Sequence, residues 1–158
     1  MMGPNDWTIE FWLYSTYWYS ACAAVAVGYH TTIPAAYNAI MFPYGSSGNT
    51  VFGGLNNGGW NKFNGNSVFP NITNNTWYHY AAVATNGGST TKFFRNGVLS
   101  NTVVNSGSTA TYQNLANAGP TTIGQYATNY NSTMLLQDIR FSSCARYTTD
   151  FTPPERFI

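Results

Sequence analysis

The sequence predicts an all-β domain built as a two-sheet antiparallel β-sandwich, and three observations support this. Residues 75–98 read as two alternating strands joined by a glycine-containing turn, with a second turn at Asn96-Gly97. Asn-Gly is a strong hairpin signal because both residues tolerate positive φ angles. No apolar pattern of helical period persists for three turns in the sequence. Short strands separated by turn signals are typical of a sandwich or jelly roll.

The strand expected at residues 77–84 carries apolar or aromatic side chains on both faces. Alternation places Trp77, His79, Ala81 and Val83 on one face, and Tyr78, Tyr80, Ala82 and Ala84 on the other. We therefore expect packing partners on both sides of this strand.

The remaining strands follow the same alternation, beginning with residues 7–14. There one face is apolar, with Trp7, Ile9, Phe11 and Leu13, and the other is mixed, with Thr8, Glu10, Trp12 and Tyr14. Further strands are expected at residues 37–42, 98–104, 121–126 and 134–142, with short strand-like pieces at 51–52 and 67–69. Connections are expected at residues 15–20, 43–48 and 105–119, with a small-residue run at 21–29 and mostly loop over 49–75.

Chain length predicts a single domain over residues 1–158, and composition predicts that it is ordered. Hydrophobic residues make up 44% and aromatic residues 17%, which excludes a disordered chain. Charged residues are 7% and the net charge is +1, so we expect no nucleic-acid partner. No apolar run is long enough for a membrane span, and the near-neutral surface favours association. Cys22 and Cys144 permit one disulfide at most, and we expect both side chains to be small buried hydrophobes.

Three segments stand out: WTIEFWLY from Trp7, NTWYHYAAVATNGGSTTKFFRNGV from Asn75, and TIGQY through MLLQDIRF from Thr122. Together they resemble the laminin-G-like, concanavalin A-like jelly-roll domain. The resemblance implies structural rather than catalytic roles for Trp77, His79, Asn96, Gly97, Asp138 and Arg140. Trp7 and Phe11 join this structural set because they lie on the apolar face of the first strand.

Near the end of the chain, residues 144–157 read CARYTTDFTPPERF. This segment resembles the closing signature of such domains in bacteriophage tail and virion proteins. The resemblance implies a virion setting. Pro153-Pro154 cannot donate to a strand ladder, so we expect an extended arm that clamps along the sandwich. Family members usually carry another strand or two before the first strand seen here. We therefore expect an open N-terminal sheet edge, or one covered by another chain.

Catalysis by a carboxylate pair is not expected. Glycoside hydrolysis needs two carboxyl groups about 5 to 10 Å apart. Asp6 and Glu10 share a strand face, but four strand residues separate their backbones by about 13 Å. His30 and His79 stand in no recognisable nucleophile motif. We therefore interpret the protein as non-enzymatic.

Asp138 is the single candidate metal ligand. Related jelly rolls often hold a structural calcium ion with an acid of the final strand, and Asp138 occupies that position. Calcium prefers six to eight oxygen ligands, usually several of them carboxylates, and Gln137 stands where a second acid is common. A salt bridge or turn contact for Asp138 is favoured over calcium, and we expect no other cofactor.

Exposed aromatic residues beside amides are the candidate binding residues. Aromatic rings stack on apolar sugar faces while amides bind hydroxyl groups, but protein interfaces prefer the same residues. The candidates are Tyr17, Trp18, Tyr19, Trp60, Asn61, Tyr126, Asn129 and Tyr130. Plain packing is the third alternative for each of them.

Two functions follow from these observations. The first is a structural protein of a bacteriophage particle, a capsid decoration or tail-associated domain that binds other virion proteins or copies of itself through loops and a sheet edge. The alternative is a carbohydrate-binding, lectin-like module of a tail fibre or of a secreted enzyme. The corresponding locations are the virion and the extracellular space.

Overall fold

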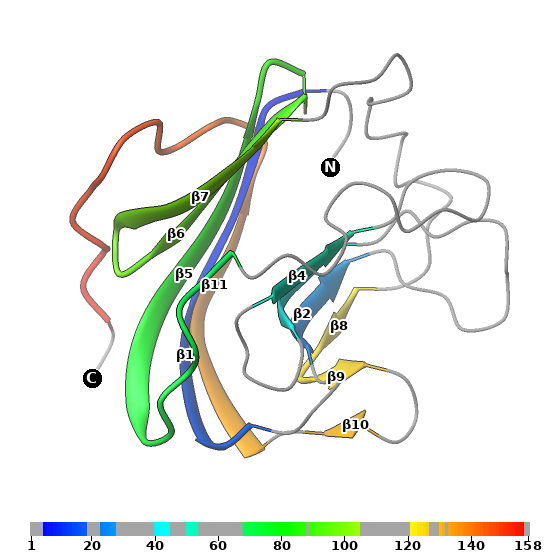
Figure 1. Cartoon of the computed structure of the whole chain (residues 1–158), viewed down its shortest axis with the longest axis vertical. Helices are drawn as coiled ribbons and strands as arrows, with labels where there is room; N and C mark the ends of the chain where they lie inside the picture. The colour runs from blue at the N-terminus through cyan, green and yellow to red at the C-terminus, as the bar shows by residue number, and fades with distance from the viewer. Residues whose placement is uncertain are drawn as a thin grey trace, which may run out of the picture.

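A computed structural model confirms the all-β prediction. It describes residues 5–18, 23–27, 40–44, 50–53, 68–87, 89–104, 121–126, 130–131 and 133–156, and these residues form strands, turns and coil. Within these ranges, no helix is long and apolar enough to cross a membrane. Figure 1 shows one long curved sheet, with smaller sheets on its inner side and the C-terminal segment along its outer side.

The strands form three antiparallel sheets in the order β11-β1-β5-β6-β7, β4-β3-β2-β8 and β10-β9. Their bounds are β1 Trp7–Tyr17, β2 Ala23–Val27, β3 Ile40–Tyr44, β4 Thr50–Gly53, β5 Thr76–Thr85, β6 Thr90–Arg95, β7 Val98–Val104, β8 Thr122–Ile123, β9 Gln125–Tyr126, β10 Tyr130–Asn131 and β11 Thr133–Ser142. The predicted strands at 7–14, 77–84, 98–104 and 134–142 are confirmed.

The first strand is not an open edge, so that expectation is wrong for β1. β5 pairs with β1 on one side and β11 pairs with it on the other, because β11 returns antiparallel along nearly the whole length of β1. In the described part of the five-stranded sheet, the edge strands are β11 and β7. Edge strands lack a strand partner on one side, and in β7 the backbone N–H groups of Leu99 and Thr102 donate to the side chains of Asp150 (2.8 Å) and Asn101 (2.7 Å).

A bulge in β11 adjusts its register against β1. Glu10 pairs with Arg140 and Trp12 pairs with Gln137, so two residues of β11 face Phe11. One of these two is Asp138, whose φ is 53°. Asp is among the few residue types that adopt this left-handed region readily, which accounts for an acid at the bulge.

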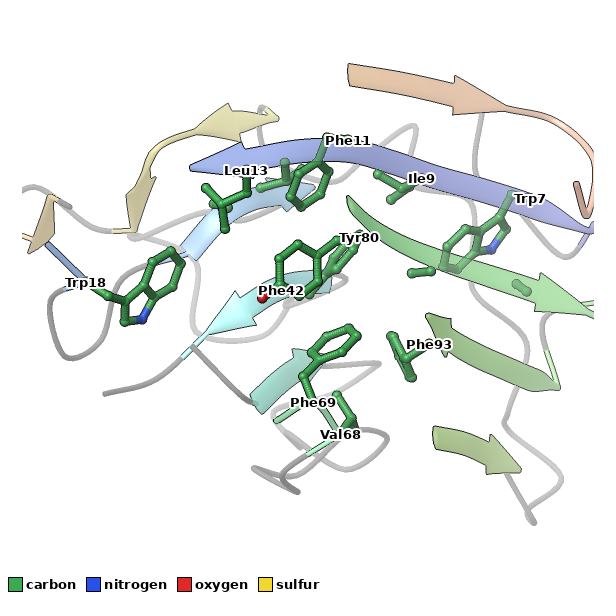
Figure 2. Packing of buried hydrophobic residues seen from close by; sticks show 14 residues of the cluster. Trp7, Ile9, Phe11, Leu13, Trp18, Phe42, Val68, Phe69, Tyr80 and Phe93 are labelled. Carbon is green, nitrogen blue, oxygen red and sulfur yellow. The ribbon is translucent and has the colours of Figure 1, made fainter. Parts of the chain in front are cut away.

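The main core lies between the inner face of the five-stranded sheet and the smaller sheet (Figure 2). Ile9, Phe11 and Tyr80 of the large sheet are fully buried there against Phe42 of β3. The ring centroids of Phe11 and Phe42 are 5.2 Å apart. Phe69 meets Tyr80 edge to face at 4.9 Å, a favourable aromatic geometry. The predicted apolar face of the first strand is confirmed as core.

A second core lies on the outer face of the same sheet, beneath the C-terminal arm, which we define as residues 143–156. Ala81, Val83 and Phe94 are fully buried there against Ala145, Tyr147 and Phe151 of the arm. The arm contains no strand. The prediction that β5 is covered on both faces is therefore confirmed, as is the prediction of a terminal arm that clamps along the sandwich.

The turn between β6 and β7 anchors this arm. Asn96 and Gly97 have φ values of 52° and 77°. The Asn96 Oδ1 accepts a hydrogen bond from the His79 backbone N–H (2.9 Å), and the Asn96 N–H donates to the His79 carbonyl (2.8 Å). The Phe151 N–H donates to the Gly97 carbonyl (2.9 Å). The predicted hairpin turn thus also holds the arm.

Several local expectations differ from the structure. The small-residue run contains a strand, β2, and β3 continues through Pro43 into the expected turn. Val68 and Phe69 are buried coil rather than strand. Cys144 is exposed near the start of the arm, so its expected burial is wrong. Cys22 and the linker at 105–119 lie outside the described residues.

Candidate functional site

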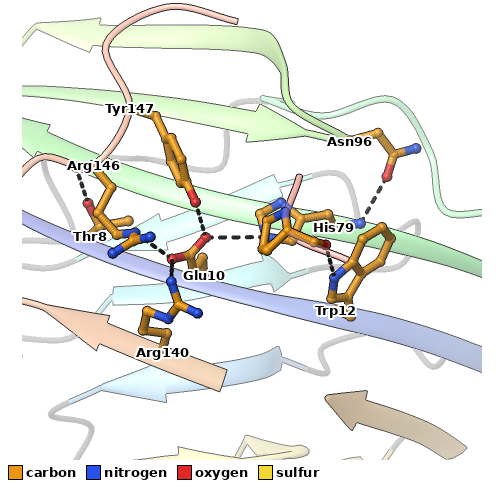
Figure 3. A network of polar contacts seen from close by, with 9 residues as sticks. Thr8, Glu10, Trp12, His79, Asn96, Arg140, Arg146 and Tyr147 are labelled. Atoms are coloured by element: carbon orange, nitrogen blue, oxygen red, sulfur yellow. Dashed lines mark hydrogen bonds and ion pairs between the residues drawn. The ribbon is translucent and has the colours of Figure 1, made fainter. Parts of the chain in front are cut away.

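The main polar cluster of the outer face surrounds the buried carboxylate of Glu10 (Figure 3). Its Oε2 accepts a hydrogen bond from the Tyr147 hydroxyl (2.7 Å) and lies 3.4 Å from His79 Nε2. Its Oε1 lies 2.9 Å from Arg146 Nε and 3.4 Å from Arg140 Nη1. Strand β1 therefore contributes one acid that β5, β11 and the arm all contact.

The surroundings of Glu10 keep its side chain ionised. Burial raises the pKa of this carboxyl, but the contacts with His79 and Tyr147 and the charge of Arg146 outweigh burial and lower the pKa overall. Burial, together with the hydrogen bond to Glu10, raises the pKa of the Tyr147 hydroxyl. The tyrosine therefore remains a proton donor to a carboxylate over the physiological pH range.

His79 lies between the carboxylate and two aromatic rings. It is 1% exposed, and its ring meets Trp12 at 5.2 Å and Phe151 at 5.7 Å between centroids. The Trp12 Nε1 donates to the Pro154 carbonyl (3.2 Å), which brings the end of the arm over this strand pair. The cluster joins the arm to the sheet, and a buried carboxylate in this position has no open face for a substrate.

Asp6, the other acid considered for a catalytic pair, has a different contact. Its Oδ1 accepts a hydrogen bond from the Gly87 N–H (3.2 Å) at the turn after β5. It is therefore engaged with the backbone of a turn, whereas Glu10 is engaged with side chains under the arm.

A group of partly exposed aromatic and polar side chains lies further along the outer face. Strand register places Tyr14 of β1 between Trp77 of β5 and Leu135 of β11. The Tyr14 and Trp77 rings are 5.3 Å apart, and the Arg156 guanidinium lies 4.3 Å from the centre of the Trp77 ring. The Tyr14 hydroxyl donates to the Asn75 Oδ1 (3.4 Å). We call Tyr14, Asn75, Trp77, Leu135 and Arg156 the aromatic platform.

The sequence predictions give no binding role to the platform. Trp77 is predicted as a framework residue, and the other four residues are not among the predicted site residues. The alternation puts Tyr14 on the mixed face of its strand and Trp77 on one of two apolar faces, so it predicts cover for Trp77 rather than exposure. Their proximity depends on the register between β1 and β5, which the sequence pattern does not specify.

The structure describes only part of the predicted binding set. Tyr17 is 58% exposed at the end of β1, as a binding residue requires. Trp18 is buried in the main core, so its proposed exposure is wrong and packing explains it. Tyr126 and Tyr130 pair through their backbones as β9 and β10. The side chains of these two residues, and all of Tyr19, Trp60, Asn61 and Asn129, lie outside what the structure describes.

The described part of the structure places no cluster of further metal ligands around Asp138. Among the described residues, no group of three or more His, Cys, Asp or Glu side chains is placed to hold a metal ion. Asp138 is partly buried at the bulge in β11. Structural calcium stays a prediction, and the positive φ at Asp138 is a backbone reason for an acid there.

Comparisons with known proteins identify the fold. The model of the concanavalin A-like lectin/glucanases superfamily matches residues 1–150. Among curated proteins, no sequence matches the chain. Domain 4 of AbnA, a GH43 extracellular arabinanase from Geobacillus stearothermophilus in complex with arabinotriose, has a TM-score of 0.68 at 18% identity, covering 92% of this chain and 63% of that chain.

Two further solved structures are similar. A putative carbohydrate binding protein from Bacteroides ovatus has a TM-score of 0.63 at 15% identity, covering 92% of this chain and 39% of that one. A Trypanosoma rangeli sialidase has a TM-score of 0.56 at 10% identity, covering 91% and 22%. This chain spans less than two thirds of each of the three structures. At these identities the likeness shows the fold.

Proposed function

The chain belongs to the concanavalin A-like lectin/glucanase superfamily, and from this premise we propose that it is a non-catalytic carbohydrate-binding domain that uses the aromatic platform. The observation that carries the proposal is the Tyr14–Trp77 ring pair beside the Asn75 amide at the surface. Aromatic rings offer a flat apolar surface to the C–H faces of a sugar. An adjacent amide supplies both a donor and an acceptor for its hydroxyl groups.

The conformation of the platform is held by the sheet and the arm. Tyr14 and Trp77 sit on neighbouring paired strands, and the Asn75 N–H donates to the Ser15 carbonyl (2.7 Å). Arg156 contacts one face of the Trp77 ring, a cation–π arrangement that restricts the ring. A restricted aromatic surface loses little conformational entropy when a ligand binds, which favours recognition.

The similar structures add support at the level of the fold. One is an arabinanase domain solved with arabinotriose, and another is a putative carbohydrate binding protein. The buried state of Glu10 argues against a carboxylate-based hydrolase at the outer face. We extend glycan binding to this chain as a proposal, with the sugar identity open to experiment.

A glycan array tests this function. Wild type is expected to bind at least one class of oligosaccharide saturably, and Trp77→Ala is expected to weaken it by about tenfold through loss of stacking. Asn75→Ala is a milder second variant that leaves the ring pair in place. Phe141→Ala, which removes an exposed aromatic elsewhere on β11, is the matched control and should bind like wild type. Absence of binding, or equal binding by Trp77→Ala with near-native circular dichroism, would contradict the proposal.

Protein–protein contact is a second candidate function, favoured by strand β7. This strand is an edge of the described five-stranded sheet and contains no charged residue. Val98 and Val104 on it are 58% and 66% exposed. Natural edge strands usually carry charges or proline that oppose pairing, and β7 carries neither. Asp150 already accepts a hydrogen bond from the Leu99 N–H, so another strand would pair with the rest of this edge. The assignment to a bacteriophage particle rests on the closing motif of the chain and stays a prediction.

Sedimentation velocity over a concentration series tests the contact function. We expect self-association of the isolated chain, and its loss in Thr102→Lys, which puts a charge on β7. Thr121→Lys adds the same charge outside the large sheet and should behave like wild type. A wild type that stays monomeric across the series would argue against pairing between copies.

A further inference from the structure

Two arginine side chains converge on one oxygen of the buried Glu10 carboxylate. Arg146 of the arm approaches Oε1 to 2.9 Å, and Arg140 of β11 approaches the same atom to 3.4 Å. Figure 3 shows the two guanidinium groups reaching that oxygen from different sides. The side chains of Arg146 and Arg140 are 35% and 44% exposed, whereas Glu10 is buried, so both arginine side chains reach the surface.

The charges in this cluster do not balance. Both guanidinium groups stay protonated at any physiological pH, and Glu10 offers a single negative charge. Within the described residues, the salt bridges that Arg140 and Arg146 form both go to Glu10. One arginine is enough to neutralise the carboxylate, and the second adds repulsion between like charges. An anion from solvent placed between the two groups would relieve that repulsion.

Neighbouring groups extend the positive surface. The Thr8 hydroxyl of β1 accepts a hydrogen bond from the backbone N–H of Arg146 (3.0 Å). The strand register places Lys92 of β6 level with Thr8, with β5 between them. The Lys92 ammonium donates to the Thr148 carbonyl (2.6 Å), two residues beyond Arg146 on the arm. Asp150, the next acid along the arm, accepts a hydrogen bond from the Leu99 N–H (2.8 Å) at β7. It is thus engaged with the backbone of the edge strand.

We propose that Arg140 and Arg146 form an anion-binding subsite that takes a carboxylate or sulfate group of an acidic glycan. The planar guanidinium fork matches the oxygens of these groups and binds them by paired, charge-assisted hydrogen bonds. Charged residues are only 7% of the chain, so the site acts locally rather than through a broad field. The assignment of the anion to a glycan rests on the proposed function, whereas the binding of an anion does not.

Inorganic sulfate is the direct probe of the subsite. In a titration of the nitrogen-15-labelled wild type followed by NMR, the Nε–H signals of Arg140 and Arg146 should shift together and saturate. Arg95 lies over the Tyr78 ring on the inner side of the sheet and provides the internal control, with only a small linear drift. Unshifted Arg140 and Arg146 signals, or an equal response from Arg95, would overturn the subsite.

Matched variants give the same test by thermal unfolding at constant ionic strength. Replacing chloride with sulfate should raise the melting temperature of wild type and of Arg95→Gln. The same replacement should leave the melting temperature of Arg140→Gln unchanged, and this variant keeps Arg146 as the partner of Glu10. Arg140→Lys, which keeps the charge and loses the fork, should respond weakly. Equal stabilisation of all four proteins would show a general salt effect and refute the site.

Acidic and neutral oligosaccharides separate the subsite from the proposed function. For a uronic-acid or a sulfated oligosaccharide, Arg140→Gln should weaken binding by at least about tenfold, while binding of neutral oligosaccharides stays unchanged. Comparing the two acidic ligands shows which anion is preferred. If sulfate binds but no oligosaccharide does, the proposed function fails and the anion site remains. If neutral oligosaccharides bind and Trp77→Ala weakens that binding, but anions do not bind, the subsite is refuted and the proposed function stands.

Discussion

Gly97 is the residue at which the β6–β7 turn and the C-terminal arm come into closest contact. Its φ is 77°, and a Cβ atom placed there would overlap the Phe151 carbonyl oxygen. Gly97→Ala should therefore cost about 2 to 3 kcal/mol of unfolding free energy, since it combines backbone strain with displacement of the arm. Urea denaturation measures the loss.

Gly124 supplies the matched control for Gly97. Its φ is 75°, but a Cβ atom there meets nothing within 4 Å. Gly124→Ala should cost only the strain of the left-handed backbone, about 1 kcal/mol. If the two variants lose the same unfolding free energy, the close contact between Gly97 and the arm adds nothing to the cost of Gly97→Ala.

Glu10 makes stability depend on pH. Its pKa is lowered in the folded state relative to the ordinary value of 4.5. The stabilisation it provides is therefore fully present above about pH 4.5 and is lost as the pH falls through the lower folded pKa. Glu10→Gln should lose about 3 kcal/mol near pH 7 and show a flatter decline between pH 5 and pH 3. Chemical denaturation across this range measures both effects, and an unchanged acid slope would contradict the assignment.

The burial of single residues can be predicted where the alternation agrees with the packing. The prediction fails where a distant part of the chain covers the residue. Ile9 and Phe11 follow the alternation and are buried as expected. Thr8 and Glu10 lie on the mixed face, yet they are buried too, because the arm covers that face. Nothing in the period-two pattern shows that a segment more than 130 residues later in the chain returns to cover this face.

At the scale of elements, the long strands were predictable and the small ones were not. Strands β1, β5 and β11 have ten or eleven residues, long enough for alternation to be clear. Strand β2 has the sequence AAVAV. Because alanine has a low strand propensity, this sequence gives no strand signal. The aromatic platform was missed for a related reason: it joins three strands and the arm, and only register assembles it.

Phe151 is one of three arm side chains that pack on the outer core of the sheet. Its ring stacks on Tyr147 at 3.5 Å and meets Phe94 edge to face at 5.4 Å. Phe151→Ala should cost about 2 kcal/mol and release the arm before the sheet unfolds. Hydrogen exchange should then show early loss of protection at the arm amides of Arg146 and Phe151, while the amides of β5 stay protected. Uniform loss across arm and sheet would show that the arm does not act as a separate element.

At the scale of the whole molecule, the two larger sheets share one core. Phe42 of β3 is fully buried and contacts Phe11 and Phe93 of the large sheet, so neither sheet buries its inner face alone. Phe42→Ala should therefore lower the unfolding free energy by about 3 to 5 kcal/mol and destabilise both sheets together. Unfolding followed by tryptophan fluorescence and by far-ultraviolet circular dichroism should give coincident transitions in wild type and variant.

A matched truncation at the surface gives the baseline for that measurement. Phe141→Ala removes the same ring from an edge strand where it is 47% exposed, and should cost about 1 kcal/mol. If Phe42→Ala instead splits the transition into two, the small sheet unfolds independently. The chain would then behave as two cooperative units, and the single domain expected from its length and composition would be wrong.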